Sequence, residues 1–259
     1  MTATVPADDR GLLLGDGLFE TILYTSRQPA MWQAHIDRLW AGCHTLGLPA
    51  PAPEALQAAG AAAIGAEPSG RAALRLTWTC GSGGRGLDRP EPAAPRLLAS
   101  AAPAPMVEGP AALAVADIRR NEHSPASRLK SLAYLDHVLA RREARAAGAD
   151  EALMLNTAGE VAGCAAANLF WVVGDQLFTP ALVCGVLAGV MRGEVLARAV
   201  QAGLRPYETR ARLADLAGAD ALFITNSLIG VRPVSRLDDR VFAPDRRIAA
   251  LKAALSDVS

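Results

Sequence analysis

The stretch SRLKSLAYLDHVLARREA, residues 127–144, contains Lys130, one of only two lysines in a chain of 259 residues. The other is Lys252, so arginine supplies the remaining 24 of the 26 basic residues. A desolvated lysine amine can lose its proton and form a Schiff base with an aldehyde, whereas a guanidinium stays charged. Lys130 is therefore a candidate for imine chemistry, although an arginine-rich composition alone would also leave few lysines.

Composition and charge indicate an ordinary globular protein. Hydrophobic residues make up 51% of the chain and charged residues 20%, and 26 acidic residues balance 26 basic ones. This balance argues against nucleic acid as the main partner. The N-terminus lacks the features of a signal peptide, and no apolar run is long enough to span a bilayer, so we expect a cytoplasmic protein without a membrane partner. The four cysteines and four histidines are scattered, which predicts neither a metal site nor a disulfide framework.

The first part of the chain contains patterns of both helix and strand. In residues 35–48, the apolar residues Ile36, Leu39, Trp40 and Cys43 recur at helical spacing on one face. Residues 71–80 alternate between apolar and polar side chains and predict a half-buried strand. The glycine-rich GSGGRG, residues 81–86, cannot continue either element.

A proline- and alanine-rich stretch between Ala99 and Ala112 predicts a linker, which we place at 104–112. It would separate an N-terminal α/β lobe, 1–103, from a C-terminal α/β lobe, 113–259, with a cleft between them. In the second lobe we expect strands at 151–156 and 221–226, a hairpin turning at Gly174–Asp175, and a helix over 189–202. A further helix is expected to bury a stripe formed by Leu132, Leu135, Val138 and Leu139.

Two short motifs could hold a phosphate. In GVLAGVMRGEV, residues 185–195, a glycine precedes a helix start, where free amides and the helix dipole favour an anion. The sequence TNS, 225–227, ends a strand with three polar side chains. Each motif alone is more typical of a plain turn.

Together with other segments, these features resemble the class IV aminotransferase family, the pyridoxal-phosphate enzymes of fold type IV, and within it the aminodeoxychorismate lyases. The resemblance implies two α/β lobes with pyridoxal 5'-phosphate in the cleft between them, a small-molecule amine substrate and a homodimer. It rests on DRGLLLGDGLFET (9–21), HIDRL (35–39), GSGGRG (81–86), KSLAYLDHVLARREA (130–144), DEALMLN (150–156), AANLFW (166–171), GVLAGVMR (185–192) and FITNSLIGVRPV (223–234).

The resemblance also implies roles for individual residues. Lys130 matches the lysine that forms the Schiff base and later moves protons, and Thr21 matches a residue close to the reacting substrate. The residues that match cofactor-binding positions are Arg38, Val190, Met191 and Ser227 for the phosphate and Tyr134 for the phenolic oxygen. Arg85, Arg119 and Arg120 are candidates for binding a substrate carboxylate, with a solvated arginine as the alternative for each.

One position departs from the family pattern. The family has a glutamate five residues before the asparagine that corresponds to Asn168, and its carboxylate holds a proton on the pyridine nitrogen. Here that position is Gly163. Glu160 lies three residues away along an extended chain and should face the opposite side of the strand.

The expected activity follows from the resemblance. We expect a lyase that converts 4-amino-4-deoxychorismate to 4-aminobenzoate and pyruvate, a step of folate synthesis. The alternatives are an aminotransferase for D-amino or branched-chain amino acids, and a paralogue that has lost efficient catalysis along with the acid at position 163.

Overall fold

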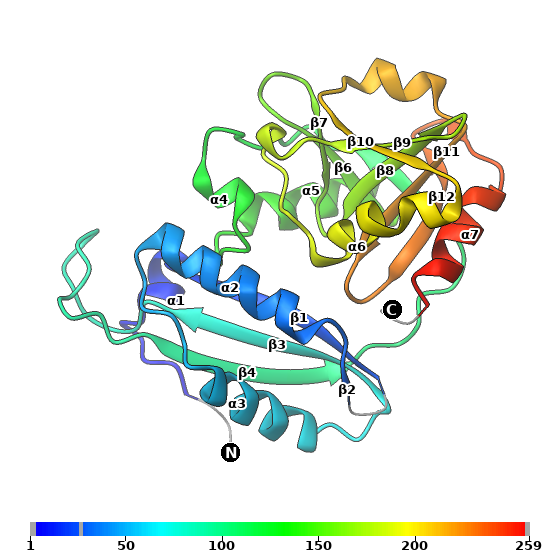
Figure 1. The fold of residues 1–259 in the computed structure, drawn as a ribbon. Helices are drawn as coiled ribbons and strands as arrows, with labels where there is room; N and C mark the ends of the chain where they lie inside the picture. The colour runs from blue at the N-terminus through cyan, green and yellow to red at the C-terminus, as the bar shows by residue number, and fades with distance from the viewer. Residues whose placement is uncertain (1–3, 26–27, 257–259) are drawn as a thin grey trace. The chain divides into compact units, whose positions relative to one another are not determined.

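The computed structural model describes residues 4–25 and 28–256 (Figure 1). Contacts divide the chain into two compact units, one formed by Met1–Pro105 with Leu129–Ala133 and the other by Met106–Arg128 with Tyr134–Ser259. The short segment Leu129–Ala133 therefore packs with the first unit. Lys130, which the sequence analysis assigns to the C-terminal lobe, makes its contacts in the N-terminal one.

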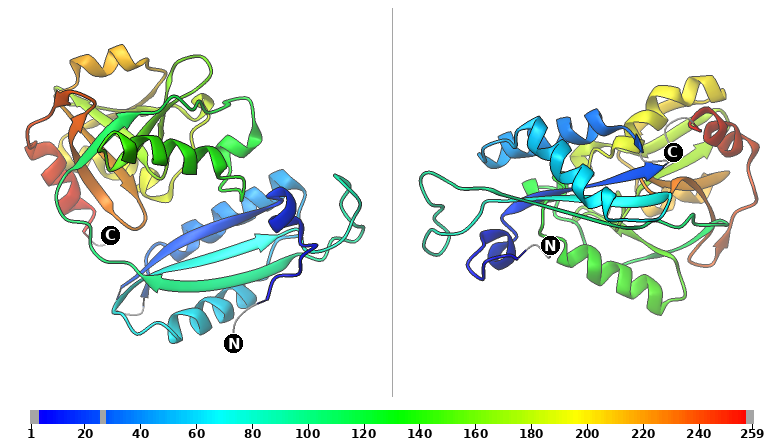
Figure 2. Two further views of the ribbon diagram at one scale, coloured as in Figure 1. Left: turned by 180° about the vertical axis from the view of Figure 1, so that it is seen from behind. Right: turned by 90° about the horizontal axis from the view of Figure 1, so that it is seen from below.

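The first unit is an antiparallel sheet of order β2-β1-β3-β4 with two long helices on one face (Figure 1). Seen from behind, the strands lie in front of these helices (Figure 2). The elements are α1 (Arg10–Leu14), β1 (Gly17–Thr25), β2 (Gln28–Pro29), α2 (Trp32–Leu46), α3 (Pro53–Gly65), β3 (Arg71–Thr79) and β4 (Arg96–Pro103).

Side-chain alternation decides which face of this sheet is buried. Leu18 and Ile22 of β1 pack with Leu74 and Leu76 of β3 in a core completed by α2 and α3. The predicted helix and strand of this unit are thereby confirmed. The opposite face carries Phe19, the neighbour of Leu18 along the strand.

The second unit is built on a nine-stranded sheet of order β10-β9-β8-β11-β12-β5-β6-β7, with β13 paired to β12. The sheet curls, because β7 at one end of this order also contacts β8 and β9. The strands are β5 (Ala111–Val115), β6 (Glu151–Leu155), β7 (Val161–Cys164), β8 (Asn168–Val173), β9 (Gln176–Pro180), β10 (Arg205–Thr209), β11 (Ala221–Asn226), β12 (Gly230–Leu237) and β13 (Arg240–Val241). The helices are α4 (Pro125–Arg128), α5 (Leu135–Ala146), α6 (Val190–Arg198) and α7 (Arg246–Ala254), with 3-10 turns η1 (Leu182–Cys184), η2 (Ala199–Ala202) and η3 (Leu213–Gly218).

Most predicted elements of this unit are confirmed. The hairpin pairs Val173 with Gln176 across the Gly174–Asp175 turn, and β6 and β11 occupy the expected segments. The helix expected over 189–202 is α helix only as far as Arg198 and then tightens into the 3-10 turn η2.

The stretch placed as a linker, 104–112, begins directly after β4, and its last two residues belong to β5, which begins at the fully buried Ala111. One expectation is corrected. In α5 the expected apolar stripe is not the buried face, since Leu135 and Val138 are 67% and 61% exposed. The helix instead packs through Ala140 and Ala144. Small side chains can bring a helix close to a sheet, so alanine here marks the core rather than a linker or a surface.

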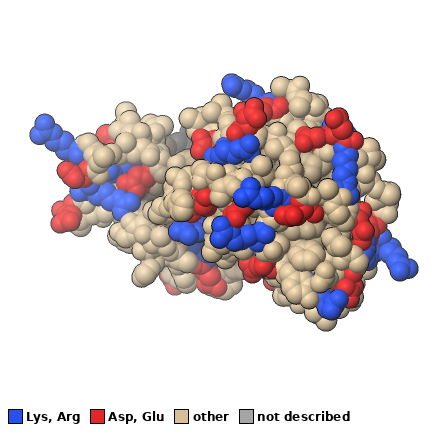
Figure 3. All heavy atoms as spheres, turned by 90° about the horizontal axis from the view of Figure 1, so that it is seen from above, with Lys and Arg blue, Asp and Glu red and all other residues tan. Residues whose placement is uncertain are grey.

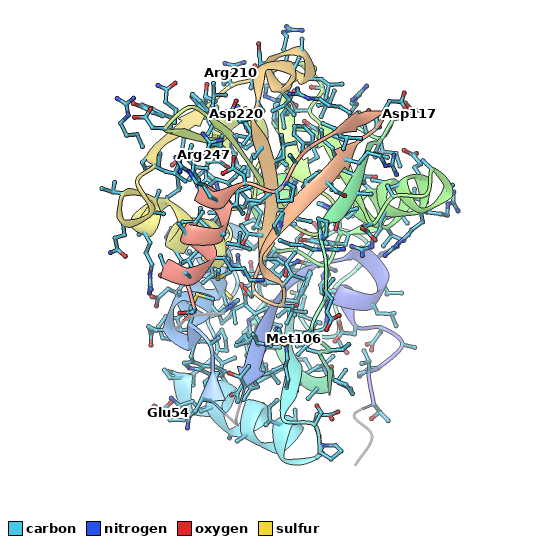
Figure 4. All side chains as sticks on the ribbon, turned by 90° about the vertical axis from the view of Figure 1, so that its right-hand side faces the viewer. Glu54, Met106, Asp117, Arg210, Asp220 and Arg247 are labelled. Atoms are coloured by element: carbon cyan, nitrogen blue, oxygen red, sulfur yellow. The ribbon has the colours of Figure 1, made fainter. Side chains whose placement is uncertain are left out.

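Ion pairs tie surface elements of the second unit together. Arg247, near the start of α7, contacts Asp220, which precedes β11, with N–O 3.2 Å (Figure 4). On the face drawn in Figure 3, acidic and basic side chains are interspersed. Within the described residues, no helix is long and apolar enough to cross a membrane.

Candidate active site

Backbone pairing fixes the position of Lys130 on the first unit. Phe19 N–H donates to the carbonyl of Lys130 at 2.9 Å, and Leu132 N–H donates to the carbonyl of Gly17 at 3.0 Å. Gly17 must be glycine, because a Cβ there would lie 2.5 Å from the carbonyl oxygen of Trp78. The segment around Lys130 therefore extends the sheet next to β1, and Lys130 Nζ lies 4.3 Å from the centroid of the Phe19 ring.

The surroundings of Lys130 favour the neutral amine. Burial lowers the pKa of Lys130 to about 8; the positive charges of Arg38 and Arg75 act in the same direction, and Glu20 opposes them. The ordinary value is 10.5. A neutral amine is the nucleophile that an aldehyde requires.

A buried carboxylate holds Arg38. Glu20 is 1% exposed and accepts from Arg38 Nε at 2.8 Å and Nη2 at 2.5 Å. His35 Nδ1 donates to the same carboxylate at 2.7 Å. Burial would raise the pKa of Glu20, but these hydrogen bonds outweigh it and keep that pKa low. The pair fixes the guanidinium plane, which is the arrangement that binding a phosphate by an arginine fork needs.

Arg75 is a functional candidate that the sequence analysis missed. Its guanidinium carbon lies 3.8 Å from the centroid of the Phe19 ring, the same ring that Lys130 approaches. Arg75 is exposed and pairs across the sheet with Thr21, so Thr21, Phe19 and Arg75 share one face. The alternation of residues 71–80 places Arg75 on the polar face, but only the register of β1 against β3 brings it to Lys130.

Arg85 lies in the exposed loop after β3. Buried Arg10 holds this loop by donating to the carbonyls of Leu87 and Asp88, each at 2.9 Å. Arg85 itself is exposed, and its backbone forms an isolated β-bridge with that of Asp88. Among the described residues, no contact joins Arg85 to Lys130, so its carboxylate-binding role stays a prediction.

In the second unit, α6 begins with an open N-terminus. Its N-cap is Gly189, which supplies no side chain, and the first turn carries the amides of Val190 and Met191. Helix geometry leaves such amides without intrahelical acceptors. A Cβ on Gly189 would lie 2.0 Å from Asn168 Oδ1, and Asn168 Nδ2 donates to the carbonyl of Leu187 at 3.0 Å. The glycine therefore allows Asn168 to hold the loop before the helix.

The strand end TNS forms a structured turn. Asn226 Oδ1 accepts from the amides of Leu228 and Ile229 at 2.9 and 3.0 Å, and its Nδ2 donates to the carbonyl of Ala166 at 2.9 Å. Ser227 is half-buried within this turn. The turn thus fixes the backbone that carries the candidate phosphate ligand.

Tyr134 is positioned by stacking. Its ring lies 4.2 Å from that of His137, with an interplanar angle of 14°. His137 Nδ1 donates to the carbonyl of Ala165 at 2.7 Å, which anchors the pair to the turn before β8. Of the two adjacent arginines, Arg119 is exposed and Arg120 is only 7% exposed.

Gly163 lies in β7 and is buried, with φ +96°. This is a left-handed conformation that side-chain-bearing residues rarely adopt. The register of β6 against β7 shifts between Leu153 and Leu155, so β7 bulges at this place. Glu160 is engaged elsewhere, accepting from Arg210 Nε at 2.7 Å and from Asn156 Nδ2 at 2.9 Å. It does not replace the expected acid.

Each unit contains residues whose chemistry suits pyridoxal phosphate. The first offers a lysine with a lowered pKa and the buried hydroxyl of Ser131, whose oxygen has no hydrogen-bond partner among the described residues. The second offers the amides of α6, the half-buried Ser227 and the buried Arg120. An amine for an aldehyde, and amides with a hydroxyl for a phosphate, match the reactive ends of this cofactor.

Comparisons with known proteins agree with this fit. The family model described as "Amino-transferase class IV" matches residues 17–237. The chain is 33% identical to an aminodeoxychorismate lyase of Vibrio harveyi over 94% of this chain and 90% of the relative. It is 35% identical to a protein of Methanocaldococcus jannaschii named "Putative branched-chain-amino-acid aminotransferase", over 92% and 84% of the two chains. The structure of 4-amino-4-deoxychorismate lyase from Pseudomonas aeruginosa superposes with a TM-score of 0.90 at 34% identity, covering 99% of this chain and 96% of the other.

The lowered pKa of Lys130 leads to a prediction about the pH dependence of Schiff-base formation. With a pKa of about 8, about a tenth of Lys130 is neutral at pH 7, against roughly one in 2,500 for a lysine with a pKa near 10.4. Apo-protein mixed with pyridoxal phosphate and trapped with borohydride should therefore label with a midpoint near pH 8. Lys252→Ala should label in the same way and Lys130→Ala should not. A midpoint near that of an ordinary lysine would contradict the role of burial.

The second prediction concerns Gly189 and the affinity for pyridoxal phosphate. Gly189→Ala should displace Asn168 and disturb the amides of α6, lowering the affinity for pyridoxal phosphate roughly tenfold or more. Gly193→Ala is the matched control, because a Cβ there meets nothing within 4 Å. That control should keep the affinity and, by helix propensity, add up to about 1 kcal/mol of stability. Equal affinities in a fluorescence titration would argue against a phosphate at this helix.

Proposed function

The chain belongs to the class IV aminotransferase family, enzymes that use pyridoxal 5'-phosphate, and from this premise we propose that it converts 4-amino-4-deoxychorismate to 4-aminobenzoate and pyruvate. The observation that carries the proposal is Gly163, which leaves β7 without a carboxylate in a backbone conformation unsuited to one. An acid beside the pyridine nitrogen strengthens the cofactor as an electron sink. Amino transfer draws on that sink in both half-reactions, whereas the lyase reaction is also driven by forming an aromatic ring.

The proposed roles of the binding residues follow from their chemistry. Lys130 would bind the cofactor aldehyde, and Tyr134 would contact the phenolic oxygen. The proposed phosphate ligands are Arg38, which Glu20 holds, and the α6 amides with Ser227. When bound, the cofactor supplies a sink for the electrons released at the carbon that bears the substrate nitrogen.

Lys130 also moves the protons. Nζ would take the proton from C4 of the substrate, the ring carbon that bears nitrogen. With the C3–O bond broken, the same amine would return the proton to the methylene carbon of the departing enolpyruvate, which gives pyruvate. The pKa of about 8 suits both steps, because the amine can accept and return a proton near neutral pH. Thr21 lies on the same sheet face as Phe19 and flanks the reacting group.

The substrate carries two carboxylates, which arginines can bind. Arg75 is the best placed in the first unit, because it shares the Phe19 ring with Lys130. Arg85 and Arg119 are both exposed and remain candidates for the same task.

The second candidate function is amino transfer. It is supported by the 35% identity to the Methanocaldococcus protein named for branched-chain amino acids. The same lysine and phosphate ligands would serve it. A paralogue without efficient catalysis is less well supported. Burial lowers the pKa of Lys130, and both the lyase and the amino-transfer reactions need an amine that is neutral near pH 7.

The function prediction is tested with purified holoenzyme. Incubation with 4-amino-4-deoxychorismate and no amino acceptor should release pyruvate, measured by coupled oxidation of NADH with lactate dehydrogenase. Lys130→Ala should lower the rate on the order of 10³-fold, and Lys252→Ala should leave it unchanged. No pyruvate from this substrate, together with amino transfer from an amino acid to 2-oxoglutarate, would overturn the lyase in favour of the second candidate.

We also propose a homodimer. The first unit exposes a group of leucines from α1 and the loop after β3: Leu12 at 65%, Leu13 at 62% and Leu87 at 84%. Leu14, which follows them in α1 and is 46% exposed, lines the same depression as Leu87, which links the two segments. An exposed apolar group of this kind is typical of an interface, and self-association would cover it. The cytoplasmic location stays a prediction from the sequence.

The dimer prediction concerns mass in solution. Sedimentation equilibrium should give twice the chain mass of 27.0 kDa. The double change Leu13→Glu with Leu87→Glu should reduce it to one chain, because two buried charges would oppose the contact. Val241→Glu, at a position 76% exposed in the second unit, is the control and should remain dimeric. A monomeric wild-type protein would contradict the proposal.

A further inference from the structure

Arg120 is a buried cation without a carboxylate partner. Its side chain donates from Nη2 to the carbonyl of Ser127 at 2.7 Å and from Nη1 to the carbonyl of Ala162 at 3.4 Å. Its Nε is buried and has no hydrogen-bond partner in the described part of the chain. Arg120 is 7% exposed, and within residues 4–25 and 28–256 no acidic side chain forms an ion pair with it.

Such a group is costly to bury. An unpaired charge and an unsatisfied N–H each oppose folding unless something accepts them. Burial lowers the pKa of Arg120, and the nearby Tyr134 and Cys164 only partly offset this effect. A guanidinium has five N–H donors, and Nη1 and Nη2 each donate to one neutral carbonyl oxygen, so a ligand acceptor would take one of the remaining Nη donors.

The neighbours of Arg120 indicate which ligand atom it would contact. The carbonyl that Nη1 contacts belongs to Ala162, the residue next to Gly163. A Cβ built on Gly163 would have a single neighbour within 4 Å, the carbonyl oxygen of Ala167 at 3.5 Å. The space around position 163 is therefore open. Tyr134, the proposed partner of the phenolic oxygen, lies near enough to act on the pKa of Arg120.

We propose that Arg120 donates a hydrogen bond to the pyridine nitrogen of pyridoxal phosphate, from the place where a carboxylate would otherwise act. This inference rests on the proposed cofactor ligands, Lys130 for the aldehyde and Tyr134 for the phenolic oxygen. On the cofactor ring the nitrogen lies para to the carbon that bears the aldehyde. An unprotonated pyridine nitrogen is a neutral acceptor, and a guanidinium is always a donor.

The consequence is a change in the electronics of the cofactor. A carboxylate would favour the protonated nitrogen, whereas a guanidinium disfavours it by charge repulsion and keeps the lone pair as acceptor. The ring is then a weaker electron sink. An elimination that forms an aromatic product tolerates this loss better than amino transfer does, which agrees with the proposed lyase. Arg120 is a cofactor-binding residue in this role rather than a ligand for a substrate carboxylate.

The first experiment measures the protonation state directly. Apo-protein is loaded with pyridoxal phosphate labelled with ¹⁵N in the ring, and the ¹⁵N chemical shift is recorded across the neutral pH range. Free cofactor at low and high pH supplies the two reference shifts. The nitrogen of the wild-type holoenzyme should give the unprotonated shift throughout. A protonated shift near pH 7 overturns the inference, and this result needs no variant.

The second experiment removes the acceptor from the ligand. The 1-deaza analogue of pyridoxal phosphate has C–H in place of the ring nitrogen and keeps the aldehyde and phosphate. Wild-type apo-protein should bind pyridoxal phosphate roughly tenfold or more tighter than the analogue, because the analogue leaves the guanidinium unsatisfied. Arg120→Met should lose this preference. Arg119→Met, a change of the adjacent exposed arginine, should keep the ratio of affinities.

The outcomes separate this inference from the proposed function. Equal affinities of the wild-type protein for the two compounds overturn the role of Arg120 and leave Lys130 and the lyase reaction intact. Failure to take up either compound overturns the cofactor ligands, and the role of Arg120 with them. If Arg120→Met does not fold, the ¹⁵N shift and the wild-type affinity ratio still decide.

Discussion

The buried carboxylate of Glu20 is the interaction on which the chemistry of the first unit depends. It lies in β1 between Phe19 and Thr21 and points into the helix side of the sheet, where Arg38 and His35 donate to it. One residue thereby orients the arginine proposed for the phosphate and places a negative charge near Lys130. Without that charge, the two arginines near Lys130 would lower its pKa further. β1 therefore sets both the binding geometry and the protonation of the catalytic amine.

Alternation along β1 explains how one strand serves both purposes. Glu20 shares its face with the apolar residues Leu18 and Ile22, so its charge is buried and must be paired. Phe19 and Thr21 face the other way, where Lys130 and Arg75 lie against the Phe19 ring. A register shift by one residue would exchange the two faces. The paired register with β3 and the required Gly17 prevent such a shift, which links the stability of the sheet to the position of the reacting amine.

The sequence predicted features that depend on local order and missed those that depend on pairing at a distance. Lys130, the α6 start and the hairpin at Gly174 follow from composition, glycine placement and alternation, and the structure contains each of these elements. Arg75 was not predicted, because only the pairing of Thr21 with Arg75 places it on the Phe19 face. The buried face of α5 was assigned to leucines, but its alanines pack against the sheet. Periodicity identifies an apolar face without revealing how close the neighbouring element approaches.

The burial of Arg120 also could not be predicted from the sequence. The sequence alone does not distinguish Arg119 from Arg120. In the structure Arg119 is exposed, whereas Arg120 is buried beside β7. An isolated β-bridge to Asn156 ties Arg120 to the fold, whereas Arg119 stays exposed. The glycine at 163 has two effects together: it removes a carboxylate and it leaves the space at its own position open. Burying a guanidinium that has no anionic partner among the described residues is costly, and a ring nitrogen held unprotonated would accept one of its remaining Nη donors. The substitution at 163 is then not simply a loss, because it is coupled to a change in the charge that faces the cofactor.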